Sequence, residues 1–253
     1  MWHWRKMAIE LLKKLNGYGC VMSKLMKTLR TVRAAAILGA GFLCGSSALS
    51  HAAEVKPSRI TRWTFDADPV GSAPAGFLFG RTGSGRVGRW IVQAEKDAPS
   101  DPNILAQVDA DQMDYRFPVA VANEPILRDA RLSVKCKTVS GDVDQACGLV
   151  FRYQDENNYD VTRANALEGN VRLYHVVKGN RQQFAGWNGT VTTGVWHELT
   201  VEAQGDHLLV FWDGQKIMEA HEQTFSQAGK VGVWTKADSV TYFDDLTVES
   251  LEP

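Results

Sequence analysis

The chain has 253 residues, with 28 Lys and Arg against 29 Asp and Glu, and a formal net charge of −1. Residues 1–53 hold eight of the basic residues and one acidic residue, so the remaining residues carry a net charge near −8. An acidic chain of about 200 residues excludes nucleic acid and anionic membranes as natural partners, and it is long enough for one domain with a real core.

The first recognisable segment, residues 24–53, has the pattern of an export signal. It has a basic start, an apolar run at 34–43, and small residues for cleavage in Ser50-His51-Ala52. The apolar run is shorter than the ~20 residues that span a bilayer, which favours a cleaved signal over a retained anchor. We expect a periplasmic or secreted protein without membrane attachment after cleavage.

The residues before this signal make the leader unusually long. A signal peptide has roughly 15 to 30 residues, and a start at Met22 or Met26 would restore that length. We therefore predict a leader and signal peptide in residues 1–53 and one domain in residues 54–253.

The predicted domain consists of short strands. Apolar residues alternate with polar ones, and the alternating runs end in Gly, Asp, Asn or Pro. The first two thirds contain expected strands at 61–66, 90–94, 103–108, 115–117, 130–137, 146–153, 159–163, 171–177 and 182–187, with a Pro- and Gly-rich loop at 68–88.

The last third gives the clearest pattern. The strands at 196–203, 208–212 and 216–219 are separated by Gly205-Asp206 and Asp213-Gly214, and Asp-Gly between alternating runs is a strong hairpin signal. A single helical turn at 222–228 and strands at 230–235 and 241–249 complete the chain. This pattern predicts an all-β fold, a two-sheet antiparallel jelly-roll sandwich.

Two cysteines remain in the predicted domain, Cys136 and Cys147. They flank a turn centred on Gly141-Asp142, so a hairpin between 130–137 and 146–153 would place them opposite each other. We predict a disulfide, which suits an oxidising compartment; two buried thiols are the alternative.

Three segments resemble the laminin-G-like and concanavalin A-like jelly rolls. The first is Trp63-Thr-Phe-Asp66 with Gly71 and Pro74; the others are 195–217, with its Trp-His strand and Asp-Gly turn, and 229–246. They look especially like exported bacterial domains described as family-16-hydrolase-like or as 3-keto-disaccharide hydrolases. This resemblance covers about residues 60–250 and implies glycan recognition or glycan chemistry outside the cytoplasm.

The chain departs from family-16 hydrolases at their catalytic strand. That strand carries Glu-x-Asp-x-(x)-Glu, and carboxylates at alternate positions share one face and can act as nucleophile and general acid. Neither Glu219-Ala-His-Glu222 nor Asp155-Glu156 reproduces it. A retaining glycosidase of that family is therefore disfavoured.

A polar sheet face on the strands between Cys147 and Arg181 is the candidate binding surface. Planar Arg, Asn and Glu groups suit vicinal hydroxyls, and aromatic rings can stack on sugar rings. The candidate ligand-binding residues are Arg152, Tyr159, Arg163, Asn165, Glu168, Arg172, Trp187 and Lys236. A solvated sheet face with cross-strand ion pairs would show the same pattern, and Glu168 is also the candidate general base.

Asp66, Asp244 and Asp245 form a candidate calcium site, because jelly rolls of this kind place the first and last strands side by side. Strand-end aspartates that cap turns are the alternative. Any calcium would be structural, and no other cofactor is expected.

Three functions follow from these observations. We expect an exported carbohydrate-recognition domain whose partner is a glycan or oligosaccharide. The alternatives are a glycan-cleaving enzyme (a glycoside hydrolase or a 3-keto-disaccharide hydrolase or lyase) and a protein-interaction module. The sequence determines neither the glycan nor the oligomeric state.

Overall fold

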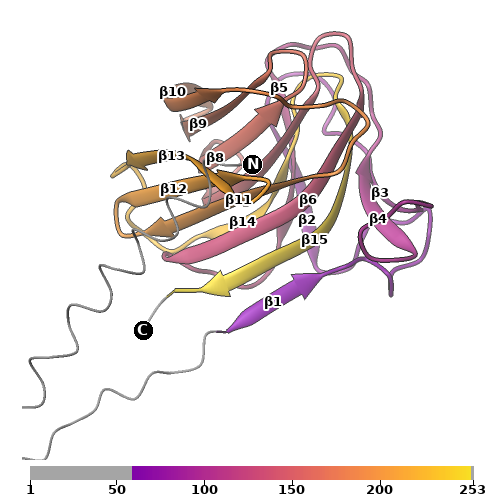
Figure 1. Ribbon diagram of the computed structural model, residues 1–253, viewed down its shortest axis with the longest axis horizontal. Helices are drawn as coiled ribbons and strands as arrows, with labels where there is room; N and C mark the ends of the chain where they lie inside the picture. Colours follow the sequence, from indigo (N-terminus) through magenta and orange to yellow (C-terminus); the bar gives the residue numbers. More distant parts are fainter. Residues whose placement is uncertain (1–58, 252–253) are drawn as a thin grey trace, which may run out of the picture. The chain divides into compact units, whose positions relative to one another are not determined.

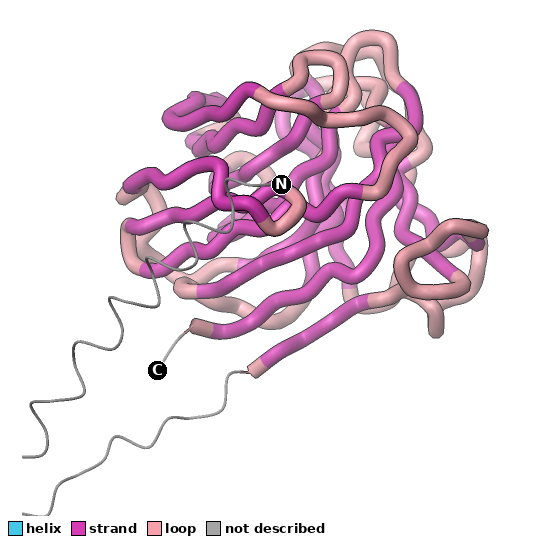
Figure 2. Tube along the Cα trace, in the orientation of Figure 1, coloured by secondary structure: helices cyan, strands magenta, loops and turns pink. Residues whose placement is uncertain are grey.

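The computed structural model describes residues 59–251, and within them the chain forms two antiparallel sheets (Figures 1 and 2). The predicted leader, its cleavage site and the alternative starts lie outside the described residues. Between residues 59 and 251 there is no helix, and hence none long and apolar enough to cross a membrane. The all-β, jelly-roll prediction is confirmed.

The eight-stranded sheet has the order β13-β12-β11-β6-β15-β4-β3, with β1 paired to β15. Its strands are β1 (Ile60–Trp63), β3 (Trp90–Ala94), β4 (Asn103–Gln107), β6 (Ala130–Ser140), β11 (His197–Gln204), β12 (His207–Trp212), β13 (Gln215–His221) and β15 (Val240–Ser250). The strands β11, β12 and β13 form the predicted meander. Residues 222–228, where we expected a helical turn, are irregular.

The seven-stranded sheet has the order β10-β9-β8-β7-β14-β5-β2. Its strands are β2 (Phe77–Gly83), β5 (Arg116–Ala122), β7 (Ala146–Asp155), β8 (Asn158–Asn165), β9 (Asn170–Val177), β10 (Asn180–Asn188) and β14 (Lys230–Trp234). The strand β2 lies inside the stretch predicted as a loop. It is an edge strand that pairs only with β5.

The main core fills the space between the sheets. Leu132 and Val134 of β6 and Val201 of β11 are fully or almost fully buried, and they meet Leu149 of β7 and Leu173 of β9 from the other sheet. Period-two alternation produces this layer, because every second side chain of each strand points inward. A second apolar cluster covers the opposite, outer face of the seven-stranded sheet, and it includes Tyr159, Tyr174 and Trp234.

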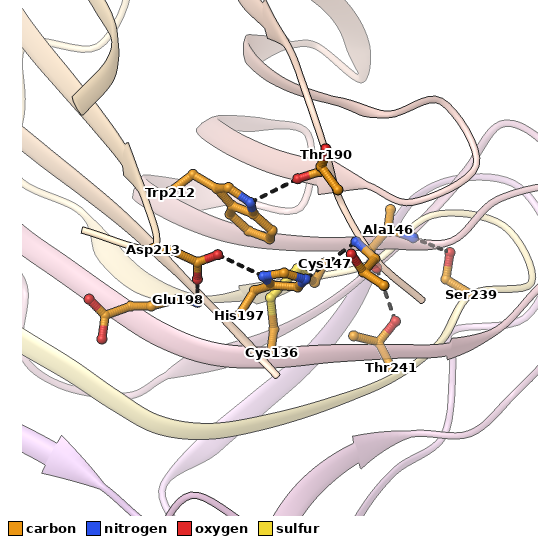
Figure 3. Close-up of a disulfide and its surroundings, with 11 residues drawn as sticks. Cys136, Ala146, Cys147, Thr190, His197, Glu198, Trp212, Asp213, Ser239 and Thr241 are labelled. Atoms are coloured by element: carbon orange, nitrogen blue, oxygen red, sulfur yellow. Dashed lines mark hydrogen bonds and ion pairs between the residues drawn. A yellow bond between two sulfur atoms is a disulfide. The ribbon is translucent and has the colours of Figure 1, made fainter. Parts of the chain in front are cut away.

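The predicted pairing of 130–137 with 146–153 is wrong, although the disulfide between Cys136 and Cys147 is present. The strand β6 pairs with β11 and β15, whereas β7 pairs with β8 and β14 in the other sheet. The disulfide therefore bridges the two sheets (Figure 3). The crossing between β6 and β7 is capped by Asp238, whose carboxylate accepts the backbone N–H groups of residues 142–144.

A compact cluster surrounds this bridge. His197, the register partner of Cys136, stacks on Trp212 with 4.7 Å between ring centroids. Its Nδ1 lies 2.8 Å from Asp213 Oδ2 (Figure 3). Its Nε2 accepts the N–H of Thr192. Both ring nitrogens thus bind protein groups, which makes His197 a structural residue, as its strand pattern indicates.

Candidate functional site on the seven-stranded sheet

Polar side chains on the outer face of the seven-stranded sheet are joined into one continuous set of hydrogen bonds, which we call the polar network. Arg163 and Arg172 are register partners on β8 and β9, so their side chains share this face, and Asn165 stands opposite Asn170. The members of the network are Asp144, Arg163, Asn165, Glu168, Asn170, Tyr174 and Lys236.

Arg163 is the centre of the polar network. Its guanidinium donates to Asn170 Oδ1 at 2.5 Å, to Glu168 Oε2 at 2.8 Å and to the Tyr174 hydroxyl at 3.1 Å. The side chain is only 2% exposed, whereas that of Glu168 is 47% exposed. The buried positive charge of Arg163 is thus paired with a carboxylate that reaches the solvent.

Glu168 is held as a carboxylate. Burial alone would raise its pKa, but hydrogen bonds from Asn170 and Arg163 outweigh that effect and keep the pKa below its ordinary value. Its backbone N–H also donates to Asn165 Oδ1. A fixed, ionised carboxylate is a good acceptor for hydroxyl groups and a poor general acid.

The other end of the network is an ion-pair chain. Asn165 donates to Asp144 Oδ1 at 2.6 Å, and Lys236 Nζ lies 2.7 Å from Asp144 Oδ2 and 2.6 Å from Asp114 Oδ1. Burial lowers the pKa of Lys236, but its bonds to Asp114 and Asp144 reverse the direction, so the pKa is raised. Asp114 remains largely exposed and marks the rim.

An aromatic floor lies beside the polar network. Phe117 and Trp234 stack with 5.3 Å between ring centroids, and the guanidinium of Arg181 lies 4.4 Å from the Phe117 centroid and 4.5 Å from that of Tyr174. Sequence reasoning singled out neither Asp144 nor Arg181. The position of Arg181 shortly after the Lys178-Gly179 turn was the available signal for it.

Most of the predicted binding residues lie on this face. Arg163, Asn165, Glu168 and Lys236 belong to the network, and Arg172 lies next to it with its guanidinium bound to Trp187 O and Asn188 Oδ1. Tyr159 is on the same face but is completely buried, with its hydroxyl held by Thr82 and Trp234. It therefore supports the floor and offers no exposed ring for stacking.

Two predicted residues are elsewhere. Trp187 pairs with Val171 and packs against the core between the sheets, because a β-bulge between Gln183 and Ala185 reverses the alternation of β10. Arg152 has a positive φ of 50° within an irregular part of β7, and its guanidinium binds the backbone carbonyls of Gly205 and Arg128. Neither belongs to the polar network.

Each of the three aspartates of the predicted calcium site binds a protein group. Asp66 accepts the N–H of Asn103, Asp244 accepts bonds from Ser100 and from the N–H of Asp245, and Asp245 pairs with Arg62 at 2.6 Å. Within residues 59–251 no three His, Cys, Asp or Glu side chains are grouped to hold a metal ion. Their oxygens cap turns and bind Arg62.

No protein-family model matches the chain, and no characterised protein matches it in sequence. Among solved structures, the chain resembles the carbohydrate-binding module CBM66 from Bacillus subtilis, with a TM-score of 0.54, 20% identity, and coverage of 69% of this chain and 96% of that one. It also resembles the Ca²⁺- and Man2-bound exoplasmic domain of VIP36, with a TM-score of 0.53, 11% identity, and coverage of 76% of this chain and 88% of that one. A third similar structure is domain 4 of AbnA, an extracellular arabinanase from Geobacillus stearothermophilus, in complex with arabinotriose. Its TM-score is 0.50 and its identity 12%, and the match covers 76% of this chain and 93% of that one.

At these identities the likeness establishes the fold. The chain has the concanavalin-like jelly-roll sandwich, with a network of planar polar groups and an aromatic floor on the outer face of its seven-stranded sheet.

Proposed function

We propose that this protein is an exported carbohydrate-recognition domain that binds a glycan on the outer face of the seven-stranded sheet. The observation that carries the proposal is the half-exposed Glu168 carboxylate, which Arg163 and Asn170 hold in place above a buried aromatic floor. A carboxylate acceptor, amide groups and guanidinium donors held in place suit vicinal hydroxyls, because little side-chain freedom is lost on binding.

Two further observations support this proposal. The solved structures with the same fold include a carbohydrate-binding module, a domain in a Ca²⁺/Man2-bound form and a domain in complex with arabinotriose. The bridge between Cys136 and Cys147 is typical of proteins that fold in an oxidising compartment. Glu168, the candidate general base, serves here as an acceptor whose lowered pKa makes it a weak base.

The test is a glycan array probed with the full-length protein, followed by titration of the best glycan. We expect Glu168→Gln to weaken binding about tenfold, since a hydrogen bond to a charged group is worth roughly 1.5 to 3 kcal/mol. Arg163→Lys keeps the charge but loses the planar fork, and it should weaken binding at least as much.

Glu249→Gln is the matched control, because Glu249 lies on β15 of the other sheet and should leave affinity unchanged. Circular dichroism confirms that each variant is folded. An array without any bound glycan, or an unchanged affinity in folded Glu168→Gln, would refute the proposal.

A further inference from the structure

A pocket of about 450 Å³ lies away from the polar network and shares no residue with it. Its walls are the turn between β11 and β12, Arg128 before β6, and the irregular segment 222–226 after β13. Its volume is within the range of ligand pockets in proteins, roughly 300 to 1,000 Å³. The pocket is therefore large enough for a small molecule and is formed by three separate parts of the chain.

The chemistry of the walls is mixed. Asp206 supplies a carboxylate, Gln223 an amide and Ser226 a hydroxyl, and Phe225 adds an apolar ring. The carboxylate of Glu222 also lines the pocket, but its two oxygens bind His175 and the N–H of Thr224. Charges of both signs line the pocket, because Arg128, Asp206 and Glu222 are all wall residues. Planar acceptors and donors around one aromatic ring suit a neutral molecule with several hydroxyl groups, whereas two carboxylates oppose a phosphate.

The walls are held from within the protein. The N–H of Glu222 donates to Asp206 O, and Gln223 Nε2 donates to Asp206 Oδ2 at 3.1 Å, so the turn and the segment are tied together. Glu222 Oε2 also lies 2.9 Å from Nδ1 of His175 on β9. The wall segment is thus anchored to the seven-stranded sheet.

Arg152 fixes the other side of the pocket. It is almost completely buried, and its guanidinium donates to Gly205 O at 2.5 Å and to Arg128 O at 3.3 Å, which are carbonyls of two wall residues. Burying a guanidinium is expensive unless it is bonded. Because the guanidinium binds two wall carbonyls, the pocket is already formed before a ligand enters. This reduces the entropy lost when a ligand binds.

We propose that this pocket is a second carbohydrate site, which takes one neutral sugar residue. The Phe225 ring covers a C–H face of the sugar, and Asp206 and Gln223 bind its hydroxyls. The polar network and the pocket have no member in common, so each site can be lost while the other remains. The inference rests on the pocket itself and not on glycan binding at the network.

The test is a ¹⁵N NMR titration of the full-length protein with methyl α-mannoside, methyl β-glucoside and fructose, and with glucuronate as the charged comparison. We expect at least one neutral sugar to give saturable shifts at the amides of Gly205, Asp206, Gln223 and Ser226. Asp206→Asn and Phe225→Ala should each weaken the affinity that these shifts report about tenfold. Phe225→Ala leaves the wall hydrogen bonds intact, so it guards against a folding defect.

Glu168→Gln is the control variant and should leave the pocket shifts unchanged. No saturable shift at the pocket with any neutral sugar, or equal shifts in folded Phe225→Ala, would overturn this proposal. Shifts at the pocket but none near Arg163 would support it while refuting the network as a glycan site. Shifts near Arg163 but none at the pocket would overturn this proposal and support the polar network as the glycan site.

Discussion

The buried guanidinium of Arg163 and the half-exposed carboxylate of Glu168 lie 2.8 Å apart, on the strand β8 and in the turn that follows it. Two more polar groups, Asn170 and the Tyr174 hydroxyl, depend on the same guanidinium. The pair is therefore asymmetric: one partner organises buried groups, whereas the other ends at solvent.

This asymmetry predicts unequal effects on stability. Arg163→Met should lower the free energy of unfolding by about 3 kcal/mol, because it leaves buried polar groups without a partner. Glu168→Gln should cost no more than about 1 kcal/mol, as for a surface ion pair. Urea denaturation of both variants measures the difference, and equal losses would contradict the assignment of Arg163 as the centre.

Removal of the disulfide should destabilise the domain without changing its fold. Cys136 and Cys147 are 11 positions apart and join the two sheets, so their loss frees the unfolded chain. We expect Cys136→Ala/Cys147→Ala to lose about 2 to 4 kcal/mol of unfolding free energy. Denaturation with and without reductant checks this, since reductant should affect only the wild type.

The pH dependence of stability should be controlled in part by Asp160. Burial and the nearby Glu222 raise the pKa of Asp160 to about 8, although Arg152 opposes the shift. Between about pH 4 and pH 8 the folded state keeps this proton and the unfolded state releases it. The stability that this group contributes therefore falls as pH rises, by up to about 1.4 kcal/mol per pH unit.

Asp160→Asn removes this titration. The variant should be more stable than the wild type at pH 8, with the difference shrinking towards pH 4, as measured by thermal unfolding across that range. Parallel stability curves for the two proteins would show that Asp160 titrates normally.

Chelation should have no effect on glycan binding. At least one carboxylate oxygen of each of Asp66, Asp244 and Asp245 already binds a backbone N–H, Ser100 or Arg62. We therefore expect the same array profile and the same melting temperature with and without EDTA. A loss of binding that calcium restores would show that a cation site exists after all.

Much of the fold could be predicted because its turns are explicit in the sequence. Gly205-Asp206 and Asp213-Gly214 define the β11–β13 meander. The strand β2 was hidden because an edge strand needs pairing on one side only and tolerates Gly80 and Gly83. The pairing of β6 with β7 was misjudged because alternation is the same whether two strands share a sheet or face each other across the core.

The site was predicted wherever alternation is regular. Arg163, Asn165 and Arg172 lie where period two places them. Arg152 does not, because it lies within a local irregularity of β7 that turns its side chain to the other face. Trp187 was expected in a loop because of its neighbouring glycines, but it lies on β10 after a bulge. A bulge of one residue has no composition signal, so counting along the strand could not reveal it.

The position of β15 has a consequence for how the domain is made. This strand lies inside the eight-stranded sheet, where it pairs with β6, β4 and β1. The first strand of the fold thus has no partner until residues 246–249 have been synthesised. Contacts of such long sequence separation form slowly and late. The eight-stranded sheet is therefore completed only when the last strand of the chain has been made.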